Sequence, residues 1–352
     1  MTTDASGNCK SALVTVSAPC RVDLGGTLDI SSLYYPLAHL QPCTFNIALE
    51  LRTRVQVRAA APGRIRVSSR GFETAEFSID KAPFSHPLGL IFAIAAFFRT
   101  DGIHIDIDSA SPPRSALGGS SVAAVALVAA LSRLRGGTKE PAPDRLASVL
   151  LAHGIEQGLA GVPCGMQDQL AAAYGGVNAW HWTLDKGRPG WRRQVLIPPE
   201  NAEKINTNLL VAYCGVPHES KDINGTWISR FLDGHDRPWW QQIVAATREF
   251  VDAFADGDMA GAAGWMNRET ELRRRITPHV VDEVGAALID AAETQNCGAR
   301  FTGAGGGGCL WALGPADAIA LLRPQWEAIV SGRTDGDILE ARVAAQGLHV
   351  ES

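Results

Sequence analysis

Alternation of apolar and polar positions predicts strands in the first third of the chain. Residues 52–58 (RTRVQVR) and 103–108 (IHIDID) alternate between the two classes, which is the period of a half-buried strand. The shorter stretches 64–68 (RIRVS) and 13–16 (LVTV) carry the same signal. From Ser17 onward the sequence SAPCRVDLGGTLD contains a proline, a pair of glycines and the charged residues Arg21, Asp23 and Asp29, and it predicts a loop.

Helical signals follow in the middle of the chain. Residues 88–98 form an apolar stretch of helical length, and residues 122–134 (VAAVALVAALSRL) are small and apolar on all sides, which indicates a buried helix. Asp144, after a proline, is a suitable N-cap for a further helix that extends to about Leu159. The chain therefore combines helices and strands.

The second half begins with strand signals and continues with helical ones. Residues 180–191 indicate a hairpin, residues 209–213 (LLVAY) a buried strand, and residues 239–293 a mostly helical region. Three tryptophans are expected in the core or at an interface, with stacking on a sugar or on adenine as the alternative: Trp227, Trp239 and Trp240.

Length and composition favour a folded protein of two domains. The chain has 352 residues, which corresponds to roughly two domains at about 150 residues each. Hydrophobic residues make up 46% and charged residues 20%, values that exclude a disordered chain. Prolines mark the change of pattern within residues 185–205, so we expect domains at residues 1–195 and 196–352.

Net charge and cysteine content limit the classes of partner and the cellular compartment that we expect for this protein. The net charge of −5 gives no electrostatic footprint for a nucleic acid. The longest apolar run, residues 87–98, is 12 residues long, whereas a bilayer span needs about 20. The N-terminus lacks the features of a signal peptide, and the seven cysteines are odd in number and have no C-x-x-C spacing. We therefore expect a cytoplasmic protein, a monomer or homodimer, with no membrane or nucleic-acid partner.

A glycine-rich loop precedes the buried helix. Residues 112–121 (PPRSALGGSS) lead directly into it, so backbone N–H groups and the helix dipole favour an anion there. Ser120 and Ser121 could add hydroxyl ligands to phosphate or Mg²⁺. The loop lacks the G-x-x-x-x-G-K-[ST] pattern of a Walker P-loop. A tight turn with a serine N-cap is the alternative.

Two carboxylates follow this loop. Glu156 lies on or beside the apolar stripe of its helix, where an unpaired charge is costly and Mg²⁺ would compensate it. A border residue that reaches water or an arginine is the alternative. Asp168 follows a turn and precedes a small apolar stretch, so it could be aimed into a cleft as a general base for an alcohol. A helix cap is the alternative for Asp168.

Two further loops contain candidate residues. In residues 19–29, Arg21 could neutralise phosphate or lower the pKa of a nearby base, and Asp29 could bind sugar hydroxyl groups. A salt bridge and a turn are the structural alternatives for these two. Residues 302–309 (TGAGGGGC) contain more glycine than a turn requires, which favours close approach of the backbone to a ligand or to the other loops.

These four segments, in this order, resemble the GHMP kinase superfamily, which comprises galactokinase, homoserine kinase, mevalonate kinase and phosphomevalonate kinase. SAPCRVDLGGTLD resembles the family's first motif, and PPRSALGGSS resembles the ATP phosphate loop. GVPCGMQDQLAAAYGG resembles the segment that supplies the catalytic aspartate, and ARFTGAGGGGC resembles the third motif. The resemblance implies a two-domain α+β fold. Its N-terminal half would be like ribosomal protein S5, its C-terminal half would be ferredoxin-like, and ATP·Mg²⁺ and an acceptor alcohol would lie between them.

The resemblance also implies roles for individual residues. Asp168 and Arg21 would be catalytic, and Ser120 and Glu156 would bind Mg²⁺. The ATP-binding residues would be Pro113, Ser115, Ala116, Leu117, Gly118, Gly119, Ser120 and Ser121. The acceptor-binding residues would be Asp23, Asp29, Gly165, Gln167, Gly303, Ala304, Gly305 and Gly306.

Within the superfamily, the motifs favour one branch. The first motif lacks the Glu-His of galactokinases, which argues against an ordinary galactokinase. Gln-Asp-Gln before Ala-Ala-Ala-Tyr-Gly-Gly, and residues 266–278 (MNRETELRRRITP), resemble heptose-7-phosphate kinases and the fucokinase branch. The predicted activity is phosphoryl transfer from ATP to a sugar or sugar phosphate, with D-glycero-D-manno-heptose 7-phosphate as the best candidate. The alternatives are a galactose or fucose 1-kinase, a regulator that binds ATP and sugar without catalysis, a decarboxylase of the same superfamily, and a nucleotide-binding protein of another fold.

Overall fold

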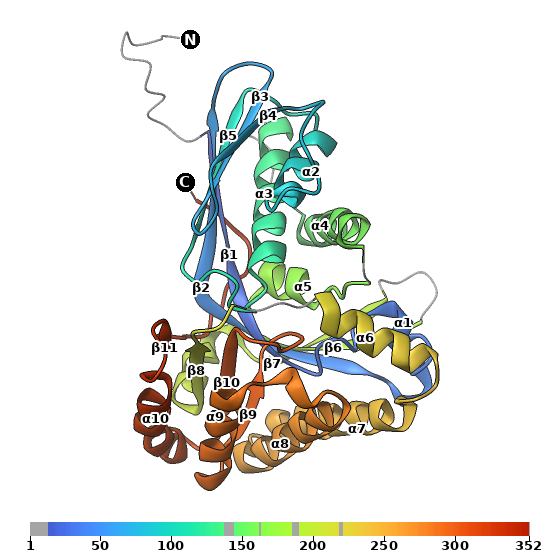
Figure 1. Cartoon of the computed structure of the whole chain (residues 1–352), viewed down its shortest axis with the longest axis vertical. Coiled ribbons are helices and arrows are strands. Elements are labelled where there is room, and N and C mark those ends of the chain that lie inside the picture. Colours follow the sequence, from blue (N-terminus) through green and yellow to red (C-terminus); the bar gives the residue numbers. More distant parts are fainter. Residues whose placement is uncertain (1–12, 137–143, 162, 185–189, 218–220, 352) are drawn as a thin grey trace.

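Two β-sheets with helices packed on them organise the chain (Figure 1). The computed structural model describes residues 13–136, 144–161, 163–184, 190–217 and 221–351. Within these residues, two hydrophobic cores hold the elements together. The first contains residues of both sheets, including β8 (Leu209–Cys214) and β10 (Cys309–Leu313), and the second contains the alternate residues of β8 and β10 with residues of the later helices. The mixed α+β architecture expected from the sequence is confirmed.

The first sheet has eight strands within the described residues, in the order β12-β1-β2-β5-β3-β4, with β6 paired to β2 and β7 to β6. All pairs are antiparallel except the parallel pair of β3 and β5. The strands are β1 (Val14–Leu24), β2 (Cys43–Ala59), β3 (Arg64–Ser69), β4 (Ala75–Ser78), β5 (Ile103–Ser109), β6 (Val177–Trp182), β7 (Trp191–Ile197) and β12 (His349–Glu351). The predicted strands at 52–58, 64–68 and 103–108 are confirmed, and so is the hairpin, although residues 185–189 of it lie outside the described residues.

One predicted loop is a strand. Residues 17–24 continue β1 instead of leaving it, and every residue from Thr15 to Leu24 is buried. The register against β2 shifts between Pro19 and Cys20, so a bulge accommodates the proline. The polar residues Arg21 and Asp23 suggested a solvated loop, but they are buried with charged partners of their own.

Four helices lie on one side of this sheet (Figure 1): α2 (Gly89–Phe97), α3 (Gly119–Gly136), α4 (Arg145–Ala160) and α5 (Gln167–Tyr174). Helix α4 packs on the other three. Helix α3 packs against β1 and β2, and residues 121–131 of it are buried without interruption, which confirms the predicted buried helix. Asp144 caps α4, because its Oδ1 accepts hydrogen bonds from the N–H groups of Leu146 and Ala147.

The second sheet has the order β11-β8-β10-β9, and its described pairs are antiparallel. In chain order this is 4-1-3-2 with helices after the first and third strands, so the expected ferredoxin-like arrangement is confirmed. Its strands are β8 (Leu209–Cys214), β9 (Gly298–Phe301), β10 (Cys309–Leu313) and β11 (Gly336–Leu339). The helices of the second half of the chain are α6 (Lys221–Leu232), α7 (Arg237–Ala255), α8 (Met259–Ile276), α9 (Glu283–Thr294) and α10 (Ala316–Val330).

The remaining elements are short: α1 (Ser31–Tyr34), η1 (Ala38–Leu40), η2 (Pro199–Asn208) and η3 (Pro278–Val280). Trp227 and Trp240 are fully buried in the second core, as predicted, and Trp239 packs against that core. The predicted domain boundary at residues 195 and 196 falls within β7, and the assignment of two domains to these ranges stays a prediction. Among the described residues, no helix has both the length and the apolar character needed to cross a bilayer.

Candidate functional site

A cavity of about 420 Å³ gathers residues from all four predicted segments. The predicted site residues in its lining are Arg21, Asp29, Pro113, Ser115, Ala116, Gly118, Gly119, Ser120, Ser121, Glu156, Gly165, Gln167, Asp168, Gly303 and Ala304. The predicted residues outside the lining are Asp23, Leu117, Gly305 and Gly306. The fold therefore brings Arg21 into the same lining as Ala304, which lies 283 positions later in the chain.

The glycine-rich loop between β5 and α3 presents its backbone to the cavity. Ala116 and Gly118 have φ angles of 61° and 79°, which are left-handed, and α3 begins directly afterwards at Gly119. The first N–H groups of a helix have no partner within the helix, and the helix dipole adds a partial positive charge. The loop end of α3 can therefore hold an anion.

Neighbouring segments fix this loop from behind. The Arg21 guanidinium donates to the carbonyl oxygen of Ala116 at 2.5 Å, and the N–H of Cys309 donates to the carbonyl oxygen of Ser115 at 2.9 Å. A Cβ on Gly308 would lie 2.7 Å from that same Ser115 oxygen, so only glycine permits this approach. Leu117 is fully buried and anchors the loop from below. The close approach of residues 302–309 to another loop is confirmed.

Glu156 on α4 faces the first turn of α3. Its carboxylate accepts hydrogen bonds from the hydroxyl groups of Ser120 (3.2 Å) and Ser121 (2.8 Å) and from the amide of Gln169 (2.7 Å). Burial raises the pKa of Glu156, and these donors oppose that effect. The carboxylate is thus bonded within the cavity wall rather than paired with an arginine.

The oxygen set of Glu156 and the two serines suits Mg²⁺, a hard cation that prefers oxygen ligands. No group of three or more His, Cys, Asp or Glu side chains among the described residues could hold a metal on its own. A magnesium ion usually combines one or two carboxylates with phosphate oxygens and water. These residues therefore fit Mg²⁺ that arrives together with a phosphate ligand.

Asp168 and Arg21 form the central ion pair of the cavity. Both Nε and Nη2 of Arg21 lie 2.8 Å from Oδ1 of Asp168. Asp168 lies in the first turn of α5, where Met166 is the N-cap and has no side-chain capping bond, so the helix-cap interpretation of Asp168 is not supported. A Cβ on Gly118 would lie 3.2 Å from the Asp168 carboxyl carbon, which brings the carboxylate next to the glycine-rich loop.

Arg21 stays protonated although its side chain is buried. Burial by itself would lower the pKa of Arg21, but Asp168 and Asp23 more than offset this effect, and the pKa is raised. Arg21 therefore remains a cation at the wall of the cavity, directly beside the Asp168 carboxylate.

Asp29 forms another part of the lining. Its Oδ2 accepts a hydrogen bond from the N–H of Gln167 at 2.9 Å, which joins the first loop to the start of α5. Burial raises the pKa of Asp29 to about 6, although the bond from Gln167 opposes that effect. Gly165 leaves the space that Asp29 occupies, because a Cβ there would lie 1.7 Å from Oδ2. The side-chain oxygen of Gln167 is buried and has no hydrogen-bond partner in the described structure.

Asp23 has a different environment from that expected of an acceptor ligand. Its side chain is fully buried, and its Oδ1 accepts a hydrogen bond from the N–H of Gly303 at 2.7 Å. Its Oδ2 lies 3.2 Å from Nη1 of Arg300. The carboxylate of Asp23 is therefore engaged by protein groups beneath the cavity rather than exposed to a ligand.

Several lining residues were missed by the sequence analysis. Gln169 bonds to Glu156, and its place in Gln-Asp-Gln was a usable signal. Asn224 on α6 brings the second half of the chain to the cavity without any motif. Apolar side chains that could contact a flat ring also line the cavity: Phe72, Pro87, Leu88, Leu90 and Ile91. Four of these five belong to the apolar run 87–98, in which nothing indicated a place in a cavity.

Comparison with known proteins finds similarity to the superfamily that the four sequence motifs resemble. The family model for the N-terminal domain of GHMP kinases matches residues 89–176. Mevalonate kinase from Pyrococcus horikoshii is 26% identical over 367 residues, which cover 96% of this chain and 98% of that protein.

Solved structures with the same fold include two sugar-related kinases. D-glycero-D-manno-heptose 1-phosphate kinase from Bacteriodes thetaiotaomicron has a TM-score of 0.71 at 16% identity and covers 97% of this chain and 99% of its own. Lactococcus lactis galactokinase, complexed with galactose, has a TM-score of 0.74 at 16% identity and covers 98% and 96%.

Proposed function

The chain belongs to the GHMP kinase superfamily, and from this we propose that it transfers the γ-phosphoryl group of ATP to a hydroxyl group of a sugar or sugar phosphate. One observation supports the proposal above all. The anion-binding end of α3, the Glu156 carboxylate and the Arg21–Asp168 pair converge on one cavity. Phosphoryl transfer depends almost entirely on such positioning and charge stabilisation.

ATP would lie with its phosphates against residues 113–121 and its base against the apolar residues of the lining. Ser120 and Glu156 would hold Mg²⁺, which supplies neutralisation of phosphate charge when it is bound. In this proposal, residues 1–195 form the ATP-binding domain. Residues 196–352 complete the cavity through Asn224, Gly303 and Ala304.

Asp168 would accept or orient the proton of the acceptor hydroxyl. As the hydroxyl proton moves to the Asp168 carboxylate, the acceptor oxygen forms a bond to the γ-phosphorus. The bond between the γ-phosphorus and the bridging oxygen breaks, and that oxygen leaves with ADP. Arg21 would keep the Asp168 carboxylate in place and offer positive charge to the transferring group. Enclosure of these groups in a cavity limits competition from water.

The acceptor would lie beside Asp29, Gly165 and Gln167. Oxygen acceptors in this region suit a ligand with several hydroxyl groups, because each hydroxyl can donate a hydrogen bond. The similarity to a heptose 1-phosphate kinase and to a galactokinase complexed with galactose supports a sugar. Within this class we propose a heptose 7-phosphate as the leading acceptor, with galactose or fucose as alternatives.

Mevalonate is a second candidate acceptor. It is favoured by the curated relative from Pyrococcus horikoshii, which is a mevalonate kinase and matches nearly the full length of this chain. Mevalonate also carries a primary alcohol that Asp168 could serve in the same way as a sugar hydroxyl. Both candidate acceptors would receive the phosphoryl group from ATP bound at the same proposed site. They would differ only in their contacts with the acceptor region.

An acceptor panel tests the proposal. We would measure ADP release with Mg²⁺·ATP and D-glycero-D-manno-heptose 7-phosphate, sedoheptulose 7-phosphate, L-fucose, D-galactose, N-acetylated hexosamines or mevalonate. Turnover with one sugar or sugar phosphate is expected. Turnover with mevalonate alone would replace the sugar assignment, and measurable ATP binding without any turnover would favour a non-catalytic regulator.

A further inference from the structure

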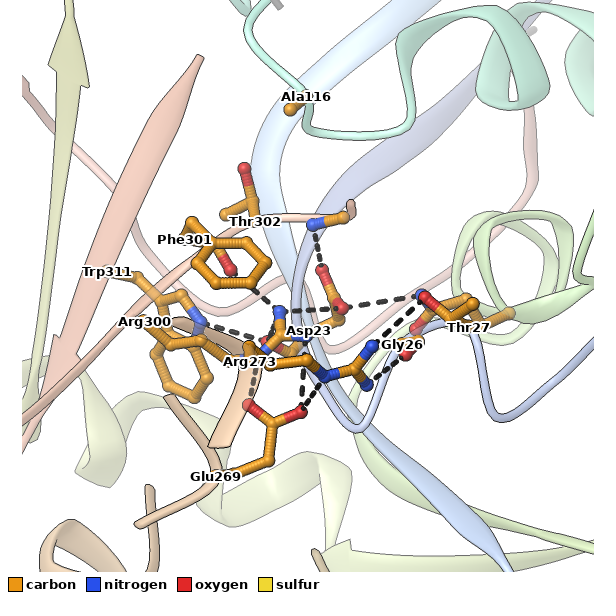
Figure 2. A network of polar contacts seen from close by, with 12 residues as sticks. Asp23, Gly26, Thr27, Ala116, Glu269, Arg273, Arg300, Phe301, Thr302 and Trp311 are labelled. Atoms are coloured by element: carbon orange, nitrogen blue, oxygen red, sulfur yellow. Dashed lines mark hydrogen bonds and ion pairs between the residues drawn. The ribbon is translucent and has the colours of Figure 1, made fainter. Parts of the chain in front are cut away.

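A buried chain of alternating charges runs from α8 to the cavity wall (Figure 2). Glu269 accepts hydrogen bonds from Nε of Arg273 and from Nε of Arg300, both at 2.8 Å. Arg300 also contacts Asp23, because its Nη1 lies 3.2 Å from the Asp23 Oδ2. The side chains of all four residues are 0% exposed.

The far end of this chain holds the loop that carries Asp29. Nη2 of Arg273 donates to the carbonyl oxygen of Gly26 at 2.6 Å, and Nη1 lies 3.4 Å from the Thr27 hydroxyl (Figure 2). The Arg273 guanidinium also lies over the rings of Trp227 and Trp240, at 4.8 and 4.7 Å from their centroids. Arg273 is therefore fixed on several sides.

The near end of the chain lies beside the central ion pair. Oδ1 of Asp23 is 3.6 Å from Nη1 of Arg21, whereas Asp168 is 2.8 Å from Nη2 of the same guanidinium. Two carboxylates thus share one arginine. Arg300 holds Asp23 from the opposite side, together with the N–H of Gly303. Without Arg300, the buried Asp23 carboxylate would have Arg21 as its remaining charged partner among the described contacts.

We propose that Arg300, Glu269 and Arg273 are positioning residues for phosphoryl transfer. Arg300, oriented by Glu269, holds Asp23 so that Arg21 stays on Asp168, and Arg273 fixes the loop that leads to Asp29. This inference rests on the proposed function, and it assigns to Asp23 the role of an intermediary in place of a substrate ligand.

The charge balance of the cluster explains why each member matters. Arg21, Arg273 and Arg300 face Asp23, Asp168 and Glu269, so three positive groups meet three negative ones. Removing one member of a buried ionic cluster leaves its partner uncompensated, and the remaining charges rearrange. The rearrangement expected here is a shift of Arg21 from Asp168 toward Asp23.

A double-mutant cycle tests this proposal. Arg300→Gln is expected to lower kcat by about 100-fold, the size of effect produced by a misplaced reacting group, with the KM for ATP changed by less than about threefold. Asp23→Asn should lower kcat less. In the double variant the loss caused by Arg300→Gln should disappear, because the competing carboxylate has lost its charge. Losses that simply multiply would show a general structural role and overturn the proposal.

A matched control and a structural readout complete the test. Glu271 lies on α8, as Glu269 and Arg273 do, but in an exposed ion-pair cluster with Arg268 and Arg275. The variant Glu271→Gln should therefore leave kcat unchanged. If Arg300→Gln does not fold, the cycle is repeated with Arg300→Lys, which keeps a buried positive charge and removes the fixed two-sided geometry of the guanidinium. A crystal structure of the folded variant should show Arg21 displaced toward Asp23. An Arg21–Asp168 contact kept at 2.8 Å would overturn the proposal without reference to activity.

The outcomes separate this inference from the proposed function. A native enzyme that phosphorylates an acceptor, combined with multiplicative losses in the cycle, would contradict the positioning role alone. A native enzyme that phosphorylates nothing in the panel, while the variant structure shows the displaced Arg21, would contradict the proposed function and leave the arrangement of the charges intact.

Discussion

At the scale of single residues, the proposed chemistry depends most on Asp168. Of the three carboxylates described in the cavity lining, it is the one that bonds to Arg21. Asp168→Asn keeps the size of the side chain and removes its basicity, so kcat should fall by about 10²–10⁴-fold. Steady-state kinetics should show a nearly unchanged KM for ATP. Asp290→Asn, an exposed change on α9, is the control, and near-normal turnover of Asp168→Asn would refute the assignment.

Asp29 should give the enzyme a pH dependence on the acidic side. Its pKa is raised to about 6, so it is ionised above that pH and protonated below it. The ionised carboxylate is the better hydrogen-bond acceptor for hydroxyl groups, and kcat/KM for the acceptor should therefore fall as the pH drops below about 6. The variant Asp29→Asn should have a raised acceptor KM and should lack this acidic decline. The same decline in the variant would show that another group causes it.

At the scale of elements, the first turn of α3 and the facing side of α4 should control the response to Mg²⁺. Ser120→Ala and Glu156→Gln each remove an oxygen ligand from the proposed site. The Mg²⁺ concentration for half-maximal activity should rise by about tenfold or more. Ser132→Ala, in the C-terminal half of α3, is the control. An unchanged Mg²⁺ requirement in both site variants would contradict the metal assignment.

The turn before α5 should tolerate no side chain at residue 165. The Cβ of Gly165→Ala would overlap the Asp29 carboxylate, because the distance to Oδ2 is 1.7 Å. The acceptor KM should rise by about tenfold or more, as expected for a displaced binding group, while ATP binding persists. Gly158→Ala on α4 meets nothing within 4 Å and should raise the stability by up to about 1 kcal/mol. Equal acceptor kinetics in the two variants would refute the proposed acceptor region.

Most elements could be predicted from the chain because their signals are local. The alternation in β5 and the uninterrupted apolar surface of α3 each lie within one short segment. β1 was predicted too short because Arg21 and Asp23 suggested solvent, whereas their partners come from elements far along the chain. Local patterning contains no information about such partners.

At the scale of the whole molecule, motifs that are continuous in sequence could be predicted, whereas contacts between residues far apart in the chain could not. The glycine loops and Asp168 were predicted because each motif is continuous in sequence. The buried cluster was not predicted, since Asp23 meets Arg300 across 277 positions and no short pattern joins them. Glu269 and Arg273 resemble any i,i+4 pair on a solvated helix. Only the contacts of Arg273 and Arg300 with residues 23–27 in the folded chain support the positioning role proposed for them.

The whole fold also explains how one cavity combines the groups that the proposed reaction needs. The first sheet and its helices supply the phosphate loop, Glu156 and Asp168. The second half supplies Asn224 and the Gly303–Ala304 backbone to the same cavity. Both contributions must be present for the acceptor and the nucleotide to meet, so we expect catalysis to require the full chain.

Phosphorus NMR of a reaction with the native enzyme tests the central proposal most directly. With Mg²⁺·ATP and the acceptor panel, we expect one new phosphate ester on a sugar or sugar phosphate to form in equal amount to ADP. No ester should appear with Asp168→Asn over the same time. Formation of ADP with free phosphate only, or no change in any mixture containing the folded native enzyme, would contradict the assignment of sugar phosphorylation to this cavity.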